Sequence, residues 1–338
     1  MLRGDSVPSF KHDRVTPAQI IILGFLLLIF TGAVLLMLPF STQEPGGASF
    51  GDALFTATSA TCVTGLVLHD TALYWSPFGQ LVILLLIQVG GMGVVTIAVA
   101  IFMFAGKRIG LKQRWVMQES ISAPQVGGIV RMTGFILKTA FLIEGIGALL
   151  LALRFCPQFG LGRGLWYAVF HSVSAFCNAG FDLMGVNSPF SSLTDYVGDP
   201  LVSNVIAFLI IIGGVGFLTW NDIREHKLHF RRYRLQSKLI LTTTLALILT
   251  GLLFFLLYEF EQGQWVDMSL WERINAAFFQ SVTPRTAGFN TVDLTGLSQP
   301  AQLLIILLML VGGSPGSTAG GFKTTTLAVM LLGIRAVF

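Results

Sequence analysis

Long apolar runs dominate the chain and restrict it to a membrane fold. A run of about 20 apolar residues is long enough to cross a bilayer as an α-helix. Such uncharged runs are Ile20–Phe40, Leu81–Ala105, Val202–Trp220 and Leu239–Tyr258. Met132–Phe155 is also largely apolar, and Ala301–Phe338 is apolar on both sides of a glycine-rich interruption. The sequence therefore predicts an all-α polytopic membrane protein.

Composition excludes the usual soluble classes. Only 11% of the residues are charged and 54% are hydrophobic, whereas about a quarter of an ordinary soluble chain is charged. The net charge of +4 is too small for a nucleic-acid-binding protein, and the apolar content excludes disorder. The three cysteines have no Cys-x-x-Cys spacing, so we expect neither a disulfide framework nor a metal site built on them.

Basic residues fix the orientation of the spans. With the N-terminus inside, the inner segments 1–19, 106–131 and 221–238 hold 14 Lys and Arg, and the outer segments hold 4. Because Lys and Arg accumulate on the cytoplasmic side, we expect a multi-pass protein of the cell membrane with a cytoplasmic N-terminus. The acidic outer segments either raise the local cation concentration or simply complement this charge rule.

Three outer segments are too apolar for loops and too short to span, which is typical of re-entrant helices. They are Asp52–Ala60, Leu165–Phe176 and Leu270–Ser281. Each leads to a glycine, and an alanine and a phenylalanine stand twelve and ten residues before it (Ala53, Phe55, Gly65; Ala168, Phe170, Gly180; Ala276, Phe278, Gly288). A span with a Gly-Gly pair follows each time (Gly90-Gly91, Gly213-Gly214, Gly312-Gly313). The chain thus reads as three parallel helix–pore-loop–helix repeats, 20–105, 132–220 and 239–338.

The repeated unit has a physical use. A re-entrant helix that stops within the membrane points its negative C-terminal end inward. The non-helical backbone after it has free carbonyl groups, which can replace the water shell of an ion. Glycine permits the positive-φ conformations that turn successive carbonyls toward one axis. Because the three loops contain no acidic side chain, they favour a carbonyl filter for a large monovalent cation; alternatively, the glycines only allow close helix packing.

The third repeat is interrupted by Gly, Ser, Thr, Ala and Pro. We expect residues 312–322 to form an irregular loop at mid-membrane, below the third pore loop, where it could gate permeation. The predicted gate residues are Gly312, Gly313, Ser314, Gly316, Ser317, Thr318, Gly320, Gly321 and Lys323. Lys323 would act as an electrostatic barrier or a salt-bridge partner, or would extend toward the cytoplasm.

Other polar residues stand in apolar surroundings. Glu144 is expected to pair with a cation or a backbone group, with a structural hydrogen bond favoured. His171 is expected in the core, because no second catalytic group accompanies it. The basic inner loops, Lys107–Arg131 and Asn221–Lys238, contact anionic lipid or dock a cytosolic regulatory subunit.

The motifs themselves resemble a known family. Thr-x-x-Thr-Gly-Leu at 61–66, Asn-Ala-Gly-Phe at 178–181 and Thr-Pro-Arg-Thr-Ala-Gly-Phe-Asn at 283–290 are similar to those of the Trk/Ktr/HKT superfamily of potassium transporters. Within this superfamily, the sequence most resembles the membrane subunit of bacterial Ktr systems, and the resemblance covers residues 16–338.

The resemblance implies four repeats around one central pore. It also implies potassium uptake, often with sodium as an activating or coupling ion, by a homodimer under a cytosolic nucleotide-binding (RCK-type) ring subunit. No cofactor and no enzyme activity are implied. By position, the filter residues are Val63, Thr64, Gly65, Asn178, Ala179, Gly180, Thr286, Ala287 and Gly288. Glycine at the first filter position, rather than serine, favours potassium.

The sequence departs from that family in having three repeats. We therefore expect a fragment of a chain about one repeat longer, which would not conduct alone. A secondary transporter of another small cation or solute would have inverted repeats, whereas these run parallel. A membrane-embedded enzyme would need paired catalytic groups, which the spans do not show.

Overall fold

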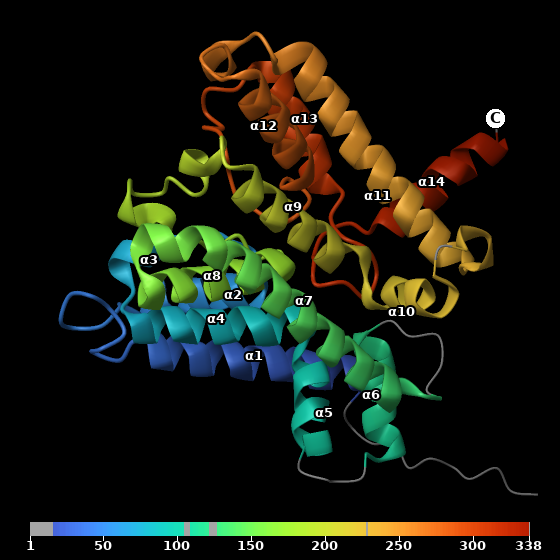
Figure 1. Ribbon diagram of the computed structural model, residues 1–338. Helices are drawn as coiled ribbons and strands as arrows, with labels where there is room; N and C mark the ends of the chain where they lie inside the picture. The colour runs from blue at the N-terminus through green and yellow to red at the C-terminus, as the bar shows by residue number, and fades with distance from the viewer. Residues whose placement is uncertain (1–15, 105–108, 122–126, 228, 338) are drawn as a thin grey trace, which may run out of the picture.

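The computed structural model describes residues 16–104, 109–121, 127–227 and 229–337 (Figure 1). Most of the predicted cytoplasmic N-terminus (1–19), parts of the predicted inner loop 106–131 and Phe338 lie outside them. About 71% of the chain is helical, and no strand is assigned in the described ranges. The all-α prediction is confirmed.

The helices form three consecutive units, each with a long helix, a short helix, a loop and a second helix. The first contains α1 (Pro17–Leu36), α2 (Phe50–Thr61), α3 (Thr71–Tyr74), α4 (Pro77–Met92) and α5 (Val94–Phe104). After α6 (Leu111–Ser120), the second contains α7 (Ile129–Phe159), α8 (Leu161–Phe176), α9 (Pro200–Val215) and α10 (Phe217–His226). The third contains α11 (Leu235–Phe254), α12 (Leu270–Val282), α13 (Gln299–Leu310) and α14 (Thr324–Val337).

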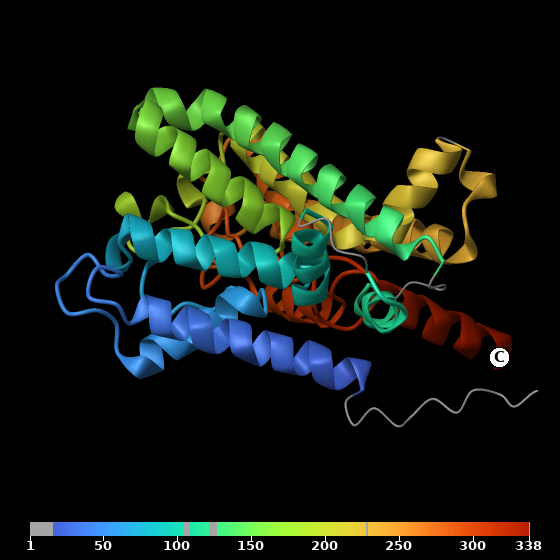
Figure 2. The same cartoon turned by 90° about the horizontal axis from the view of Figure 1, so that it is seen from below.

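In each unit the short helix packs along the long helix before it, as α2 on α1, α8 on α7 and α12 on α11. Contacts of α8 with α4 and of α12 with α9 join neighbouring units (Figures 1 and 2). The C-terminal turns of the three short helices are buried.

The second helix of every unit starts in the same way. Ser76, Asp199 and Ser298 accept a backbone N–H of the first turn, and a proline follows within two residues. A capping side chain satisfies a free N–H, and proline at that position loses no hydrogen bond. This is a further similarity between the repeats that the glycine alignment did not use.

The predicted spans Leu81–Ala105 and Val202–Trp220 are wrong as single helices. The chain bends by 98° between α4 and α5 and by 94° between α9 and α10. The turning residues are Gly93 (φ +84°) and Gly216 (φ +96°), and an α-helix cannot continue through a positive φ. The third unit breaks at the corresponding place, because α13 ends at Leu310 and the chain is irregular until Thr324. The first two breaks follow the Gly-Gly pair directly, whereas the third begins just before it, because α13 ends at Leu310 and the pair is Gly312-Gly313.

The distribution of apolar side chains fits a bilayer. Among the described residues, three helices are long and apolar enough to cross it, or up to five spans are present if each bent pair counts as one. Their outward side chains are exposed, including Leu27 (71%), Leu149 (68%) and Leu257 (83%). The aligned alanines of the short helices, Ala53, Ala168 and Ala276, are fully buried. The aligned phenylalanines share no such role, because Phe170 is buried and Phe55 is 37% exposed.

Candidate ion site

The loops after the three short helices adopt one repeated backbone conformation. In each, a non-glycine residue has a positive φ, namely Val63 (56°), Asn178 (59°) and Thr286 (71°). The glycine two positions later is also left-handed, with φ of 80° at Gly65, 72° at Gly180 and 87° at Gly288. A positive φ in the β-branched residues Val63 and Thr286 is rare and strained. Strain of this kind persists where the surroundings enforce it, which is typical of functional sites.

Hydrogen bonds from the ends of the short helices enforce this shape. Thr64 N donates to Ser59 O (2.8 Å), and Ala179 N donates to Ser174 O (2.8 Å). In the third loop Ala287 N donates to Thr283 O (3.1 Å). The hydroxyls of Ser174 and Thr283 also donate to the carbonyl just after the loop glycine, at 2.6 Å in both cases. The shape of each loop is therefore fixed by hydrogen bonds to the end of its own short helix.

The three loops meet one another. A Cβ at Gly65 would lie 2.6 Å from the carbonyl oxygen of Ala179, and one at Gly180 would collide with the carbonyl oxygen of Ala287. A Cβ at Gly288 would lie 3.5 Å from the Cα of Gly180. The structure therefore brings the nine predicted filter residues together, with the second loop between the other two.

The Gly-Gly pairs lie directly behind these loops. A Cβ at Gly90 would collide with the carbonyl oxygen of Thr61 at the end of α2. A Cβ at Gly213 would collide with that of Phe176 at the end of α8. Glycine here allows α4 and α9 to touch the ends of α2 and α8, so these glycines serve packing. The loop glycines differ, because they also need a positive φ.

The irregular segment 311–323 lies against two of the pore loops. Thr318 Oγ1 donates to Phe176 O and accepts from Asn178 Nδ2, both at 2.9 Å. A Cβ at Gly321 would lie 3.4 Å from the Thr286 methyl group. The segment is thus held at the second and third pore loops.

The same segment also contacts the interrupted second helix of the middle unit. Ser314 N donates to Gly214 O (2.9 Å), and Phe217 N donates to Gly316 O (2.7 Å). An irregular loop at 312–322 was predicted, and the structure has one.

Lys323 bonds within that segment: its Nζ donates to the carbonyls of Ala319 (3.0 Å) and Gly320 (3.4 Å). Its partners in the described chain are therefore backbone oxygens rather than the carboxylate of a salt bridge.

The favoured structural hydrogen bond of Glu144 is present, but the partner is neither a cation nor a backbone group. Gln88 Nε2 on α4 donates to both carboxylate oxygens, at 3.0 and 3.2 Å.

His171 is a core residue, as predicted. It is fully buried, with Nδ1 bonded to Tyr167 O (2.7 Å) and Nε2 accepting from Leu183 N (3.2 Å). It braces the chain that leaves the second pore loop.

Arg285 is a residue whose position the sequence did not reveal. The charge rule puts it in an outer segment, yet its side chain is only 6% exposed. It lines a small void behind the loops together with Asn178, Gly214 and Gly313. Its Nε has no hydrogen-bond partner among the described residues. A signal existed, because this arginine stands inside the third pore-loop motif.

Comparison with known proteins identifies the family. Residues 7–338 match the family described as TrkH, cation transport protein. The chain belongs to this family. Membership places it among membrane transport proteins rather than enzymes and confirms the resemblance noted from the motifs.

Relatives of the TrkH family share much of the sequence. The chain is 42% identical to the potassium/sodium uptake protein NtpJ of Enterococcus hirae, over 97% of this chain and 71% of that protein. It is 44% identical to the Ktr system potassium uptake protein B of Bacillus subtilis, over 96% of this chain and 72% of that protein.

A solved structure has the same fold. The crystallised potassium transporter TrkH of Vibrio parahaemolyticus superposes with a TM-score of 0.70 at 20% identity, over 97% of this chain and 63% of that one. The chain therefore spans somewhat less than two thirds of the crystallised TrkH chain.

Proposed function

We propose that the protein mediates potassium uptake through a carbonyl filter formed by Val63–Gly65, Asn178–Gly180 and Thr286–Gly288. The observation that carries the proposal is a pair of left-handed residues, two positions apart, that recurs in three loops which touch one another. Alternating backbone handedness turns successive carbonyls to one side, where they can replace water around an ion. The ends of α2, α8 and α12 add partial negative charge behind them. Relatives named as potassium or potassium/sodium uptake proteins are consistent with K⁺ as the transported ion and Na⁺ as a second, activating or coupling ion.

We further propose that residues 312–322 gate the path. The position of this segment supports the gating role, because it lies against the second and third pore loops through Thr318 and Gly321. Because its backbone is irregular, it can move without unwinding a helix. With the N-terminus inside, this segment would stand on the cytoplasmic side of the proposed filter.

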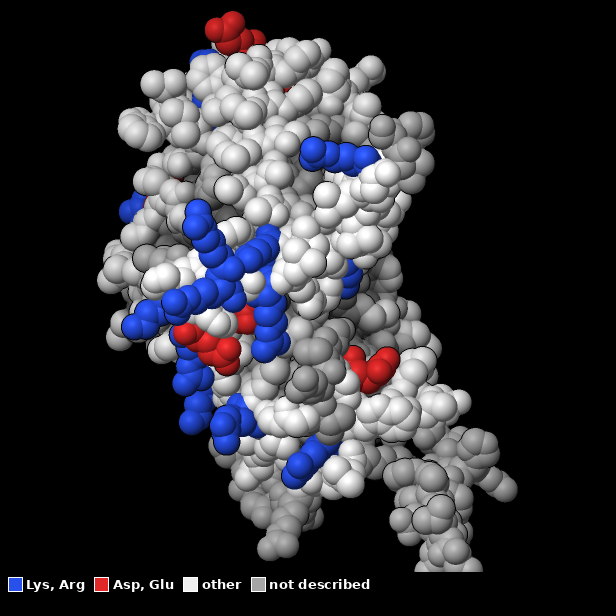
Figure 3. All heavy atoms as spheres, turned by 90° about the vertical axis from the view of Figure 1, so that its right-hand side faces the viewer, with Lys and Arg blue, Asp and Glu red and all other residues white. Residues whose placement is uncertain are grey.

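The remaining parts of the proposal concern assembly. The N-terminus is cytoplasmic, the protein is a homodimer, and a cytosolic nucleotide-binding subunit docks on the basic inner loops. Several Lys and Arg side chains gather on the face seen in Figure 3. The exposed residues Lys227, Arg231 and Arg232 between α10 and α11 suit such a partner, since a basic surface attracts an acidic one.

The filter is tested by ion selectivity. Gly180→Ala and Gly288→Ala are expressed from the complete reading frame in cells without their own potassium uptake, and Rb⁺ and Na⁺ uptake are compared. Both variants should lose preference for Rb⁺, because a Cβ strains the left-handed loop. Gly214→Ala is the matched control, because a Cβ there meets nothing within 4 Å. Unchanged selectivity in both loop variants, with normal expression, contradicts the filter assignment.

A further inference from the structure

A cationic cavity lies where α5, α6, α7 and α10 meet. It has a volume of about 790 Å³. Its cations are Arg114 of α6, Arg131 and Lys138 of α7, and Arg224 of α10, and no acidic side chain is among its described lining residues. Met103, Ile129, Val130 and Phe135 supply apolar walls. Four cations surround one largely apolar hollow and outnumber the single acidic residue of the adjoining hollow, Glu225, so the site favours an anionic group.

The four cations are exposed side chains, and a contact with the apolar wall orients one of them. The guanidinium carbon of Arg224 lies 4.8 Å from the centroid of the Phe135 ring, a cation–π contact that fixes the arginine. Arg131, Phe135 and Lys138 follow one another at i, i+4 and i+7 and so share one face of α7. At 1.5 Å per residue, Lys138 lies about 10 Å further along that helix than Arg131. The charged wall therefore extends from the inner end of α7 toward the membrane interior.

We propose that this cavity binds the phosphate headgroup of an anionic phospholipid from the inner leaflet. Charge complementarity selects the anion, and basic pockets between membrane helices on the cytoplasmic side suit such headgroups. The depth of Lys138 and the apolar walls select a lipid over a soluble phosphate, because a soluble ligand has no chain to place against Met103 or Val130.

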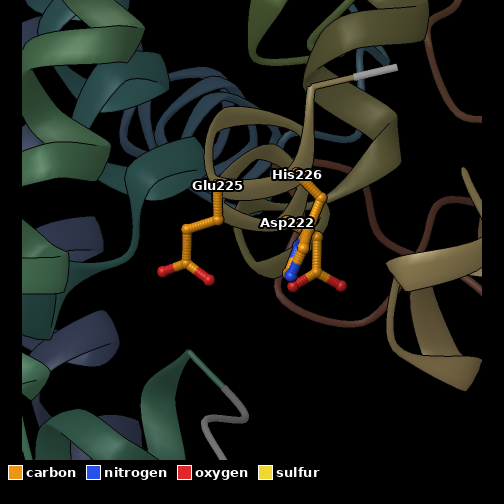
Figure 4. A group of neighbouring side chains, drawn as sticks. All are labelled: Asp222, Glu225 and His226. Atoms are coloured by element: carbon orange, nitrogen blue, oxygen red, sulfur yellow. The ribbon is translucent and has the colours of Figure 1, made fainter. Parts of the chain in front are cut away.

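A neighbouring group could instead suggest a metal ion. Single ligand atoms of Asp222, Glu225 and His226 lie within 4.8 Å of one another on α10 (Figure 4). Arginine already partners this group, because Arg234 Nε lies 3.4 Å from Asp222 Oδ1. Asp222 Oδ2 accepts from Arg234 N (3.1 Å) and Ser237 Oγ (2.6 Å). Asp222 therefore ties α10 to α11, and the cationic surroundings disfavour a metal.

The lipid would hold two elements that touch the proposed gate. α10 begins at Phe217, whose N–H donates to Gly316 O. A Cβ at Gly316 would lie 2.7 Å from the carbonyl oxygen of Ile121, just after α6. A headgroup bound by Arg114 and Arg224 would join α6 to α10 and so steady the segment between them. This consequence for flux rests on the proposed gating function; the binding site itself does not.

The test measures lipid binding without transport. The complete transporter is purified, and its retention of phosphatidylglycerol against phosphatidylcholine is measured by native mass spectrometry. Arg131→Gln combined with Arg224→Gln should weaken phosphatidylglycerol binding about 30-fold, since each basic residue near such a surface contributes about fivefold. The control is Arg231→Gln with Arg232→Gln, two exposed arginines outside the cavity, and it should bind like the parent.

Three results would overturn the proposal: equal losses in the test and control pairs, no preference of the parent for phosphatidylglycerol, or displacement of the lipid by soluble glycerol phosphate at equal concentration. If the double variant does not fold, Lys138→Gln alone should show a loss of about fivefold. Because binding is read in purified protein, a failure of potassium uptake in cells would refute the proposed function and leave this result standing.

Discussion

Removal of one hydroxyl should release the proposed gate. Thr318 is 5% exposed, and its Oγ1 makes the two 2.9 Å bonds that tie segment 311–323 to Phe176 and Asn178. Thr318→Val keeps the side-chain volume and deletes both bonds. A hydrogen bond contributes about 1 kcal/mol net, so the observed position of the segment should lose about 2 kcal/mol. That change shifts the equilibrium toward a displaced segment by about 30-fold.

The assay is the initial rate of Rb⁺ uptake in cells without their own potassium transport. The rate should rise severalfold, with about 30-fold as the upper limit set by the lost bonds. Selectivity over Na⁺ should persist, because the backbone of the second pore loop is held separately by Asn178 N to Ala175 O (3.0 Å). Thr326→Val is the control, since Thr326 is exposed on α14, and it should leave uptake unchanged.

Thermal unfolding of the purified variant separates the outcomes. The melting temperature of Thr318→Val should fall relative to that of Thr326→Val, which would show that the bonds exist in the membrane protein. A lowered melting temperature with an unchanged uptake rate would refute the reasoning, because the bonds would then stabilise the fold without restraining a gate.

Three further changes test the packing around the site. Gly213→Ala should lower the melting temperature and reduce uptake, because its Cβ collides with a backbone carbonyl, whereas Gly214→Ala should be neutral; equal effects would contradict this contact. Glu144→Leu leaves the amide of Gln88 buried without its partner and should lower the free energy of unfolding by about 1–3 kcal/mol. Glu144→Gln should be tolerated. Equal melting temperatures of the two variants would contradict the hydrogen bond between Gln88 and Glu144. Ser174→Ala removes the 2.6 Å bond at the exit of the second pore loop and should weaken Rb⁺ over Na⁺ discrimination in uptake assays, so full discrimination would show that the loop keeps its shape without that bond.

Local features of the sequence predicted much of the fold. The re-entrant segment Leu270–Ser281 corresponds to α12 (Leu270–Val282), and Leu165–Phe176 corresponds to the last three turns of α8. Apolar length and the small residues that end each helix are properties of neighbouring residues, so they can be read directly. The irregular loop at 312–322 was predictable for the same reason, since glycine and proline oppose a helix wherever they cluster.

The bends at Gly93 and Gly216 were missed because the apolar run continues through them. Hydropathy measures whether a segment suits the membrane and says nothing of its direction. The sequence did contain a signal, because Gly-Gly-x-Gly occurs at both bends. The third repeat breaks beside its own Gly-Gly pair.

Partners distant in sequence could not be predicted. Gln88 and Glu144 are 56 positions apart, and Asn178 and Thr318 are 140 apart. Each pair exists only because the units pack together, and many other polar side chains would have served equally well. The filter role of the nine loop residues stays a prediction.

The location of the transported ion tests the central claim most directly. Thallium(I) resembles K⁺ in size and scatters anomalously, so crystals of the complete transporter can be soaked with it. We predict a thallium peak bounded by backbone carbonyls of Val63–Gly65, Asn178–Gly180 and Thr286–Gly288, lost on exchange into K⁺ and kept in equal Na⁺. A peak elsewhere along the path, or none at these loops in protein that takes up Rb⁺, would contradict the account.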